Sequence, residues 1–369
     1  MRKSTVIVGG GVVGLGIGWK LAQRGEPVVL LERGVCGREA SWAAAGMLAP
    51  ANEAHFQEDE NLHLGQESMA LYPDFVAELE EVTGLDVDYR TEGTLSVALD
   101  ADDTGVLKEL YAAQQSYHLP VRWLTGDQAR AIEPGLSNYV CAGIFCPMDH
   151  QVDNRKLMEA LKAAFLKAGG ELHENTEVTE IRLNGERLVC TSEQTWPAER
   201  IVLAAGAWSG MIPGLGENVR PPVRPVKGQM LSMMSPGPDF LTHVIRAPGI
   251  YIAPKNNGTI VFGATVEEMG FDRNLTAGGQ YSLLKGAWET VPGVYELPIK
   301  ESWVGFRPGS RDNAPLLGET ALPGLFVATG HHRGGILFAP ATALHMSTLI
   351  LEGITPEPLK PFDPKRFLA

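Results

Sequence analysis

The first hydrophobic run of the chain, Thr5–Val8, is short, β-branched and followed by three glycines, which predicts a fully buried parallel strand. After it, apolar residues recur at every fourth position from Val13 to Leu21, beside a stripe of small residues. This spacing predicts a helix that packs closely on a sheet and ends at Arg24-Gly25. A second apolar run, 27–31, ends at Glu32. The first 32 residues therefore predict one β-α-β unit.

Similar elements return after residue 149. Asp153 can cap a helix that carries an apolar face and stops at Gly169-Gly170. Two strand-like stretches then flank Asn184-Gly185, a pair that favours a tight hairpin. The apolar run 200–206 predicts another buried strand, and 325–353 predicts a last strand, a glycine loop and a helix.

The pattern changes between Pro221 and Pro315, where proline and glycine are frequent and the apolar segments look like strands. We therefore expect a mixed α/β (α+β) fold, in which a Rossmann-like dinucleotide-binding domain carries an inserted antiparallel-sheet substrate domain. We assign residues 1–80, 141–220 and 318–369 to the first domain, and residues 81–140 and 221–317 to the second.

Composition narrows the class of protein. The 369 residues include 31 Lys and Arg against 44 Asp and Glu, a net charge of −13, which argues against nucleic acid as a partner. Hydrophobic residues make up 44% of the chain, enough for a large core. Four cysteines are too few for a disulfide framework in a chain of this length, so we expect a reducing, cytoplasmic setting.

The amino-terminal segment imitates a membrane or signal sequence. It has 16 uncharged residues between Lys3 and Lys20, and its glycines match the GxxxG pattern of paired membrane helices. However, a spanning helix needs roughly 20 residues, and six of the sixteen are glycine. We therefore expect no stable membrane insertion.

The most informative motif is Gly9-Gly10-Gly11-Val12-Val13-Gly14, a G-x-G-x-x-G sequence between the predicted strand and helix. Gly9 permits the tight turn, Gly11 lets backbone N–H groups approach a pyrophosphate, and Gly14 lets helix and strand pack closely. Glu32 can accept hydrogen bonds from a ribose hydroxyl at the end of the second strand. Together these features predict an adenine dinucleotide site.

We expect this dinucleotide to be FAD rather than NAD. The sequence has no second G-x-G-x-x-G, so a separate nicotinamide domain for reducing a flavin is not expected. Residues 38–49 are mostly small and follow the ribose-binding strand, where their backbone N–H groups can run along a long cofactor. The alternative for this segment is an ordinary buried loop.

Several motifs resemble one enzyme family over nearly the whole chain and in the same order. They are VIVGGGVVG with Glu32, SWAAAGML, VLAAGAWS, VGFRPGSRDNAPLLG and GHHRGGILFAPAT. Together they resemble the D-amino acid oxidase family of FAD enzymes, and within it most closely the glycine oxidases of thiamine (thiazole) synthesis. The resemblance implies non-covalent FAD, oxidation of small amines and transfer of electrons to O2.

The resemblance also implies which residues meet the cofactor. Val178 matches a residue whose backbone meets the adenine, and the loop from His331 to Leu337 matches the one that meets the isoalloxazine ring. With the fingerprint, the expected cofactor-binding residues are Gly9, Gly11, Val12, Val13, Gly14, Glu32, Arg33, Ala40, Ser41, Ala45, Gly46, Met47, Val178, His331, His332, Arg333, Gly334, Gly335, Ile336 and Leu337.

Three residues are expected at the substrate. Arg307 matches the arginine that binds the substrate carboxylate, and guanidinium geometry suits a bidentate carboxylate partner. Its alternative is a structural arginine paired with Asp312. Tyr251 matches an active-site tyrosine, or is a plain strand aromatic, and Arg333 matches a second substrate contact, or turns outward beside its glycines. Adjacent histidines rarely share one ligand face, so we expect no metal at His331 and His332.

The expected reaction is hydride transfer from the substrate α-carbon to flavin N5, assisted by a helix that starts after Gly334-Gly335. O2 then gives H2O2, and the imine of glycine hydrolyses to glyoxylate and ammonia. The resemblance implies a homotetramer and a possible hand-off of the imine to thiazole synthase. Alternatives are a quinone-linked D-amino acid dehydrogenase, a sarcosine oxidase-like enzyme and a non-catalytic flavoprotein.

Two departures from the family pattern affect these expectations. Gly305-Phe306-Arg307-Pro308 lacks the cysteine through which some relatives attach flavin, so a covalent flavin is not expected. Gly249-Ile250, just before Tyr251, lacks a polar side chain associated with some glycine oxidases. The size of the pocket and the substrate preference therefore stay open.

Overall fold

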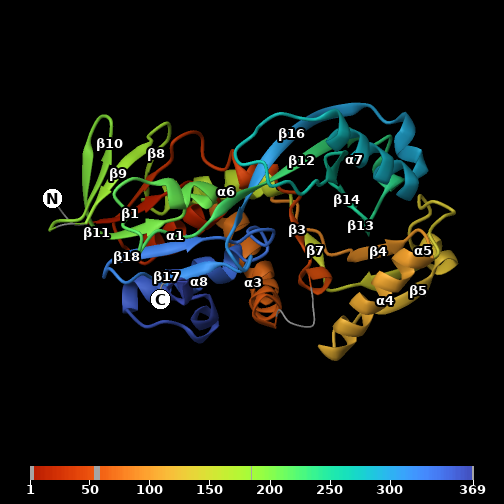
Figure 1. The fold of residues 1–369 in the computed structure, drawn as a ribbon, viewed down its shortest axis with the longest axis horizontal. Coiled ribbons are helices and arrows are strands. Elements are labelled where there is room, and N and C mark those ends of the chain that lie inside the picture. Colours follow the sequence, from red (N-terminus) through yellow and green to blue (C-terminus); the bar gives the residue numbers. More distant parts are fainter. Residues whose placement is uncertain (1–3, 54–58, 184, 368–369) are drawn as a thin grey trace.

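The computed structural model describes residues 4–53, 59–183 and 185–367, and its two lobes are each built on a large β-sheet (Figure 1). Both ends of the chain lie in the same lobe, while the other lobe is made of internal segments. None of the helices within the described residues is both long enough and apolar enough to cross a lipid bilayer.

The first sheet has the order β17-β18-β11-β1-β2-β8. Its central strands are parallel, as expected for β-α-β units, and β17 closes one edge in the antiparallel direction. The predicted hairpin is formed by β9 and β10, and β10 also pairs with β11. Asn184, at the predicted turn, lies outside the described residues. The strands are β1 (Ser4–Val8), β2 (Val28–Leu31), β8 (Glu171–His173), β9 (Val178–Arg182), β10 (Leu188–Thr191), β11 (Thr195–Leu203), β17 (Leu316–Glu319) and β18 (Leu325–Thr329).

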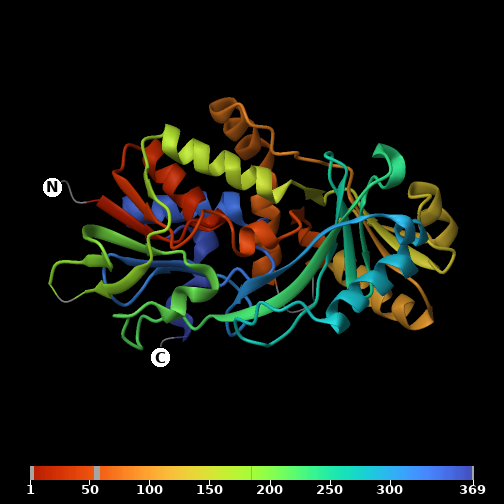
Figure 2. The same cartoon turned by 90° about the horizontal axis from the view of Figure 1, so that it is seen from above.

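Alternate residues of these strands enter two different cores, because side chains in a strand point to opposite faces in turn. Ile7 and Leu30 pack against a helical layer, whereas Val6 and Val29 pack on the other face under the hairpin. The helical layer consists of α1 (Val12–Gln23), α3 (Asp59–Thr83), α6 (Asn154–Lys167) and α8 (Ala339–Glu352) (Figure 2).

The predicted helix signals are confirmed at both ends of α6, which stops at Lys167 just before Gly169-Gly170, and at the end of α8. Asp153 caps α6 by accepting hydrogen bonds from the N–H groups of Arg155 and Lys156 at 2.9 and 3.2 Å. Gly353 ends α8 in the left-handed region with φ 70°. The start of α8 differs from the expectation: the helix begins at Ala339 rather than directly after Gly334-Gly335, since a turn closed by the Phe338 N–H to Gly334 carbonyl bond comes between.

The second sheet has the order β16-β12-β15-β14-β13-β4-β6-β5, and every neighbouring pair except β13 and β4 is antiparallel. Its outer helices are α4 (Ala101–Ser116), α5 (Gly126–Ile132) and α7 (Ala277–Thr290). Its strands are β4 (Thr94–Ala98), β5 (Arg122–Thr125), β6 (Ala142–Cys146), β12 (Arg224–Met234), β13 (Val244–Ala247), β14 (Ile250–Pro254), β15 (Thr259–Gly263) and β16 (Ile299–Gly309).

One expected boundary does not agree with the strand pairing. The division at residue 141 assigned β6 to the first domain, but β6 pairs with β4 and β5 in the second sheet. The apolar run of β6 does not reveal this, because the pairing of a strand with strands elsewhere in the chain has no signal in the local sequence. The rest of the domain division stays a prediction.

Several short elements complete the structure. They are the two-stranded sheet of β3 (Met47–Leu48) and β7 (His150–Gln151), helix α2 (Ala40–Ala43) and the 3-10 helices Pro50–Glu53, Gly206–Met211, Pro238–Phe240, Pro292–Glu296, Glu357–Phe362 and Pro364–Phe367.

Candidate active site

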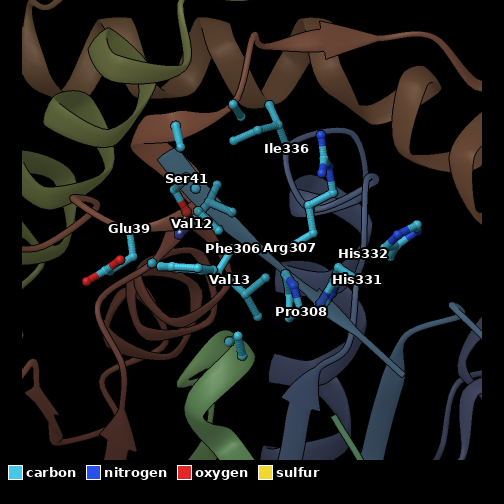
Figure 3. Close-up of a pocket in the computed structure, with 18 of the residues that line it drawn as sticks. Val12, Val13, Glu39, Ser41, Phe306, Arg307, Pro308, His331, His332 and Ile336 are labelled. Carbon is cyan, nitrogen blue, oxygen red and sulfur yellow. Dashed lines mark hydrogen bonds between the residues drawn. The ribbon is translucent and has the colours of Figure 1, made fainter. Parts of the chain in front are cut away.

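A cavity of about 1090 Å³ lies between the lobes. Figure 3 shows side chains from separate segments gathered around it, with Val12 and Val13 from α1, Ser41 from α2, Arg307 from β16 and Ile336 from the loop before α8. The cavity therefore collects residues from both ends and the middle of the chain.

Nearly all of the residues expected at the site line this cavity. They are Gly9, Gly11, Val12, Val13, Glu32, Arg33, Ala40, Ser41, Ala45, Gly46, Met47, Val178, Tyr251, Arg307, His331, His332, Arg333, Gly334, Gly335, Ile336 and Leu337. Gly14 is the exception, because it packs behind the turn. A Cβ on Gly14 would lie 2.0 Å from the Gly9 carbonyl oxygen, so this glycine serves the close approach of helix and strand.

The glycine turn opens toward the cavity. Gly9 has φ 112°, and a Cβ there would lie 2.4 Å from the carbonyl oxygen of Ala204, the residue that follows β11. A Cβ on Gly11 would meet only the Ser41 hydroxyl, at 3.3 Å. That hydroxyl accepts a hydrogen bond from the Val12 N–H at 3.0 Å. The turn thus presents the first N–H groups of α1, which have no partner within the helix, to a bound anion.

Glu32 has a second task besides the expected one. Its carboxylate accepts hydrogen bonds from the Gly10 N–H at 2.8 Å and the Gly34 N–H at 2.9 Å. The side chain therefore holds the glycine turn against the end of β2. Each carboxylate oxygen has a further lone pair for a ribose hydroxyl.

An aromatic residue that the sequence analysis did not single out lies beside Arg33. The Arg33 guanidinium carbon is 3.8 Å from the centre of the Trp208 ring, and the same side chain forms an ion pair with Glu39 at 2.9 Å. Trp208 lines the cavity, and Phe271 from the second lobe stacks on it at a centroid distance of 4.7 Å. The motif VLAAGAWS contains Trp208, but its letters do not indicate this stacking.

The segment along the middle of the cavity is anchored by a buried lysine, also absent from the expected set. The Lys255 ammonium group donates to the carbonyl oxygens of Ala45 and Val152, each at 2.7 Å, and to Gln151 Oε1 at 3.2 Å. Burial lowers the pKa of Lys255 to about 8. Gly46 is required beside it, since its φ is 73° and a Cβ would lie 2.0 Å from the Val152 carbonyl oxygen.

At the other end of the cavity, Arg307 lies across a glycine of the neighbouring strand. A Cβ on Gly228 would be 2.7 and 2.8 Å from the two terminal nitrogens of Arg307. Nη1 also donates to the Thr265 carbonyl oxygen at 3.1 Å. Asp312, the partner in the alternative interpretation of Arg307, forms an ion pair with Arg366 at 2.9 Å.

Tyr251 is arranged in the same way on the next pair of strands. A Cβ on Gly263 would be 2.3 Å from the Tyr251 hydroxyl, which lies 3.6 Å from the Met230 sulfur. Burial raises the pKa of Tyr251 above its ordinary value, so the hydroxyl keeps its proton at neutral pH. Two glycines therefore leave room on the sheet for a guanidinium group and a phenol.

Arg246 is a cavity residue that the sequence analysis missed. It pairs directly with Tyr251 across the β13–β14 hairpin, so both side chains leave the same face of the sheet, and it lines the cavity. A signal was available, because Pro248-Gly249 forms a two-residue turn that pairs the residues on either side of it.

The loop from His331 to Phe338 closes the cavity. His331 is buried, and burial lowers its pKa to about 3, so the ring is neutral. Its nitrogen Nε2 is 3.2 Å from the Thr342 hydroxyl oxygen. Arg333 is exposed, as its alternative interpretation allowed, but still lines the cavity.

The cavity suits FAD on two observations. It extends from the glycine turn to the loop at 331–338, and residues of both segments line it. Both segments also present backbone to it, since a Cβ added at Gly11 or Gly335 would meet no other backbone atom. The described residues that line it include no cysteine.

Comparisons with known proteins agree with this geometry. The family model "FAD dependent oxidoreductase" (DAO) matches residues 4–349. A glycine oxidase from Geobacillus kaustophilus is 38% identical over 100% of this chain and 98% of that protein. A crystal structure of glycine oxidase from the same species has a TM-score of 0.94 at 36% identity, covering 100% and 99% of the two chains.

A bifunctional ThiO/ThiG protein from Trichormus variabilis is 36% identical over 100% of this chain, which spans 55% of that longer protein. The chain therefore belongs to the DAO family of FAD-dependent oxidoreductases and is an FAD-dependent amine oxidase.

Proposed function

We propose that the protein oxidises glycine and other small primary or secondary amines, such as sarcosine and D-alanine, with O2 as the electron acceptor. The products are H2O2 and an imine, which water converts to glyoxylate and ammonia when glycine is the substrate. The observation that carries this proposal is the guanidinium group of Arg307, spread over Gly228 beside the Tyr251 hydroxyl at one end of an FAD-sized cavity.

Arg307 binds the substrate carboxylate in this proposal. A guanidinium group offers two parallel N–H donors that match a carboxylate. The Thr265 carbonyl orients the group from one edge. The Tyr251 hydroxyl stays protonated, so it can donate a further hydrogen bond to the same carboxylate.

The surrounding side chains favour a small substrate. Tyr251, Met230 and Trp303 occupy one row of directly paired residues, so their side chains share one face of the sheet, and Tyr251 and Met230 line the cavity. These side chains would hold the reacting C–H bond of the substrate in position and exclude water from it.

FAD, when bound, supplies a two-electron acceptor for the substrate hydride and passes the electrons to O2. The glycine turn, Glu32 and Ser41 would hold its diphosphate and ribose, and the loop at 331–338 would hold the ring end. We also propose that the protein is cytoplasmic, forms a homo-oligomer, and hands the glycine imine to a thiazole synthase. The length match with half of a ThiO/ThiG protein supports that last link.

The decisive assay measures H2O2 formation from glycine, sarcosine and D-alanine by the purified yellow protein, with O2 as the sole acceptor. Arg307→Ala leaves a buried carboxylate without its partner, which costs about 3–5 kcal/mol and raises KM on the order of a hundredfold or more. Arg311→Ala is the matched control, since Arg311 is exposed and rests on Phe367.

Three outcomes would contradict the proposal. A colourless protein would refute FAD binding, and an unchanged KM in Arg307→Ala would show that another group binds the carboxylate. A flavin that glycine bleaches but that air reoxidises only slowly would point to a quinone-linked dehydrogenase instead.

A further inference from the structure

One face of α3 lies along the loop that closes the cavity. Gly65, Ser68 and Tyr72 are spaced by three and four residues, so they share a face of the helix. A Cβ on Gly65 would lie 3.4 Å from the Leu337 side chain, which shows how closely the helix and the loop pack there.

Two buried hydroxyl groups connect α3 to the backbone of this loop. The Tyr72 hydroxyl donates to the Ile336 carbonyl oxygen at 2.6 Å, and the Ser68 hydroxyl donates to the Leu337 carbonyl oxygen at 2.6 Å. Both side chains are completely buried. Since water cannot replace these partners, each hydrogen bond strongly constrains the carbonyl that it meets.

Ser68 also replaces one hydrogen bond at the start of α8. Its Oγ accepts from the Ala341 N–H at 3.4 Å while it donates to Leu337, the carbonyl four residues earlier. In an uninterrupted helix that N–H and that carbonyl would bond to each other. The hydroxyl therefore takes part in setting where α8 begins.

These contacts determine where the loop N–H groups point. In a planar trans peptide, C=O and N–H point in opposite directions. Because Tyr72 holds the Ile336 carbonyl toward α3, the Leu337 N–H points away from that helix. Within the described part of the chain neither Ile336 N–H nor Leu337 N–H has an acceptor, and both residues line the cavity.

We propose that Tyr72 and Ser68 are positioning residues: Tyr72 holds the peptide group between Ile336 and Leu337 so that its N–H dipole is directed into the FAD cavity, and Ser68 fixes the next peptide group, whose Phe338 N–H donates to the Gly334 carbonyl. A fixed N–H dipole stabilises negative charge more than a mobile one, because it needs no reorganisation when the charge appears. Reduction increases the negative charge on a flavin, so the two hydroxyls favour the reduced cofactor from outside the cavity.

The Tyr72 hydroxyl is suited to a permanent donor role. Burial raises its pKa well above the ordinary value, with Tyr89 adding to the effect, so it keeps its proton across the working pH range. Its ring stacks on Tyr89 at a centroid distance of 6.0 Å. Tyr89 in turn has its hydroxyl 2.6 Å from His150 Nδ1, whereas the Tyr72 hydroxyl meets the Ile336 carbonyl of the loop.

The test compares Tyr72→Phe with Tyr89→Phe, two substitutions that each remove one hydroxyl from the same stacked pair. The readout is the two-electron midpoint potential of the bound FAD, measured by equilibration with a reference dye during reduction by dithionite. Substrate is not needed, so failure of the proposed function leaves this test intact. We expect Tyr72→Phe to lower the reduction equilibrium constant at least tenfold, equivalent to about 30 mV.

Tyr89→Phe is expected to change that constant less than threefold, even if it lowers the melting temperature as much as Tyr72→Phe does. Ser68→Ala serves as the second variant and is expected to lower the potential in the same direction. An unchanged potential in both Tyr72→Phe and Ser68→Ala, or an equal shift in Tyr89→Phe, would overturn the inference. If Tyr72→Phe does not fold, the comparison of Ser68→Ala with Tyr89→Phe decides.

Discussion

Replacement of Gly228 by alanine perturbs Arg307, the arginine that we propose binds the substrate carboxylate, without removing it. Gly228 lies in β12 directly opposite Gly305 of β16, and its backbone is outside the left-handed region, so alanine introduces no backbone strain. The new methyl group would lie 2.7 Å from Nη1 and 3.0 Å from Cζ of Arg307.

The guanidinium group must therefore move by about 0.7 Å or more to reach an ordinary contact distance of 3.4 Å. The displaced atoms are the far end of a flexible side chain, so the fold tolerates the change, but the alignment of two parallel hydrogen bonds with a carboxylate is lost. One hydrogen bond to a charged group contributes about 1.5–3 kcal/mol. We therefore expect a loss of about 2 kcal/mol in substrate binding, or about 30-fold in KM.

The assay is steady-state H2O2 formation over a range of glycine concentrations, together with FAD content and melting temperature. Gly278→Ala is the matched control, because a Cβ at that position meets no atom within 4 Å. We expect the control to keep the KM of the parent protein. If Gly228→Ala binds FAD and keeps the same KM, the guanidinium group of Arg307 does not hold the substrate carboxylate.

Three further predictions test other parts of the site. Glu32→Ala removes the acceptor of two backbone N–H groups, so titration of the apoprotein by flavin fluorescence is expected to show at least tenfold weaker FAD binding; unchanged affinity would contradict this. Lys255→Met leaves two buried carbonyls without donors and is expected to lower the stability to urea by about 1–3 kcal/mol; a more stable variant would show that burial of the ammonium outweighs its bonds. Burial raises the pKa of Asp149 to about 7 from 3.8, so between pH 4 and 7 the unfolded chain loses a proton that the folded chain keeps, and stability falls as pH rises by up to about 4 kcal/mol. Asp149→Asn is expected to remove this dependence in thermal unfolding curves, and parallel curves for both proteins would contradict it.

Local patterns predict the dinucleotide end of the candidate site, and most of the residues concerned line the cavity. The strand, glycine turn, helix and Glu32 lie within the first 32 residues, and their geometry depends on backbone requirements that glycine satisfies and other residues do not. Arg307 and Tyr251 came from the family resemblance, and the glycines beneath them, Gly228 and Gly263, were not recognised.

Contacts between distant segments account for most of what was missed. Tyr72 and Ile336 are 264 residues apart, and Lys255 and Ala45 are 210 residues apart. No periodicity in one segment indicates such a partner in another. The late start of α8 has a local origin instead, because Gly334 is needed where the Phe338 ring packs back on the loop, 2.2 Å from where a Cβ would lie.

The distribution of the cavity along the chain has a consequence for biosynthesis. The glycine turn leaves the ribosome before β11, which pairs with β1 and follows about 190 residues later, and the loop at 331–338 follows later still. At a synthesis rate of about 5–20 residues per second, the interval between β1 and β11 is on the order of tens of seconds. During that time β1 has an apolar edge without its partner. Only a chain synthesised through this loop can contact both ends of the cofactor, so we expect a chain truncated before residue 331 to form no holoenzyme.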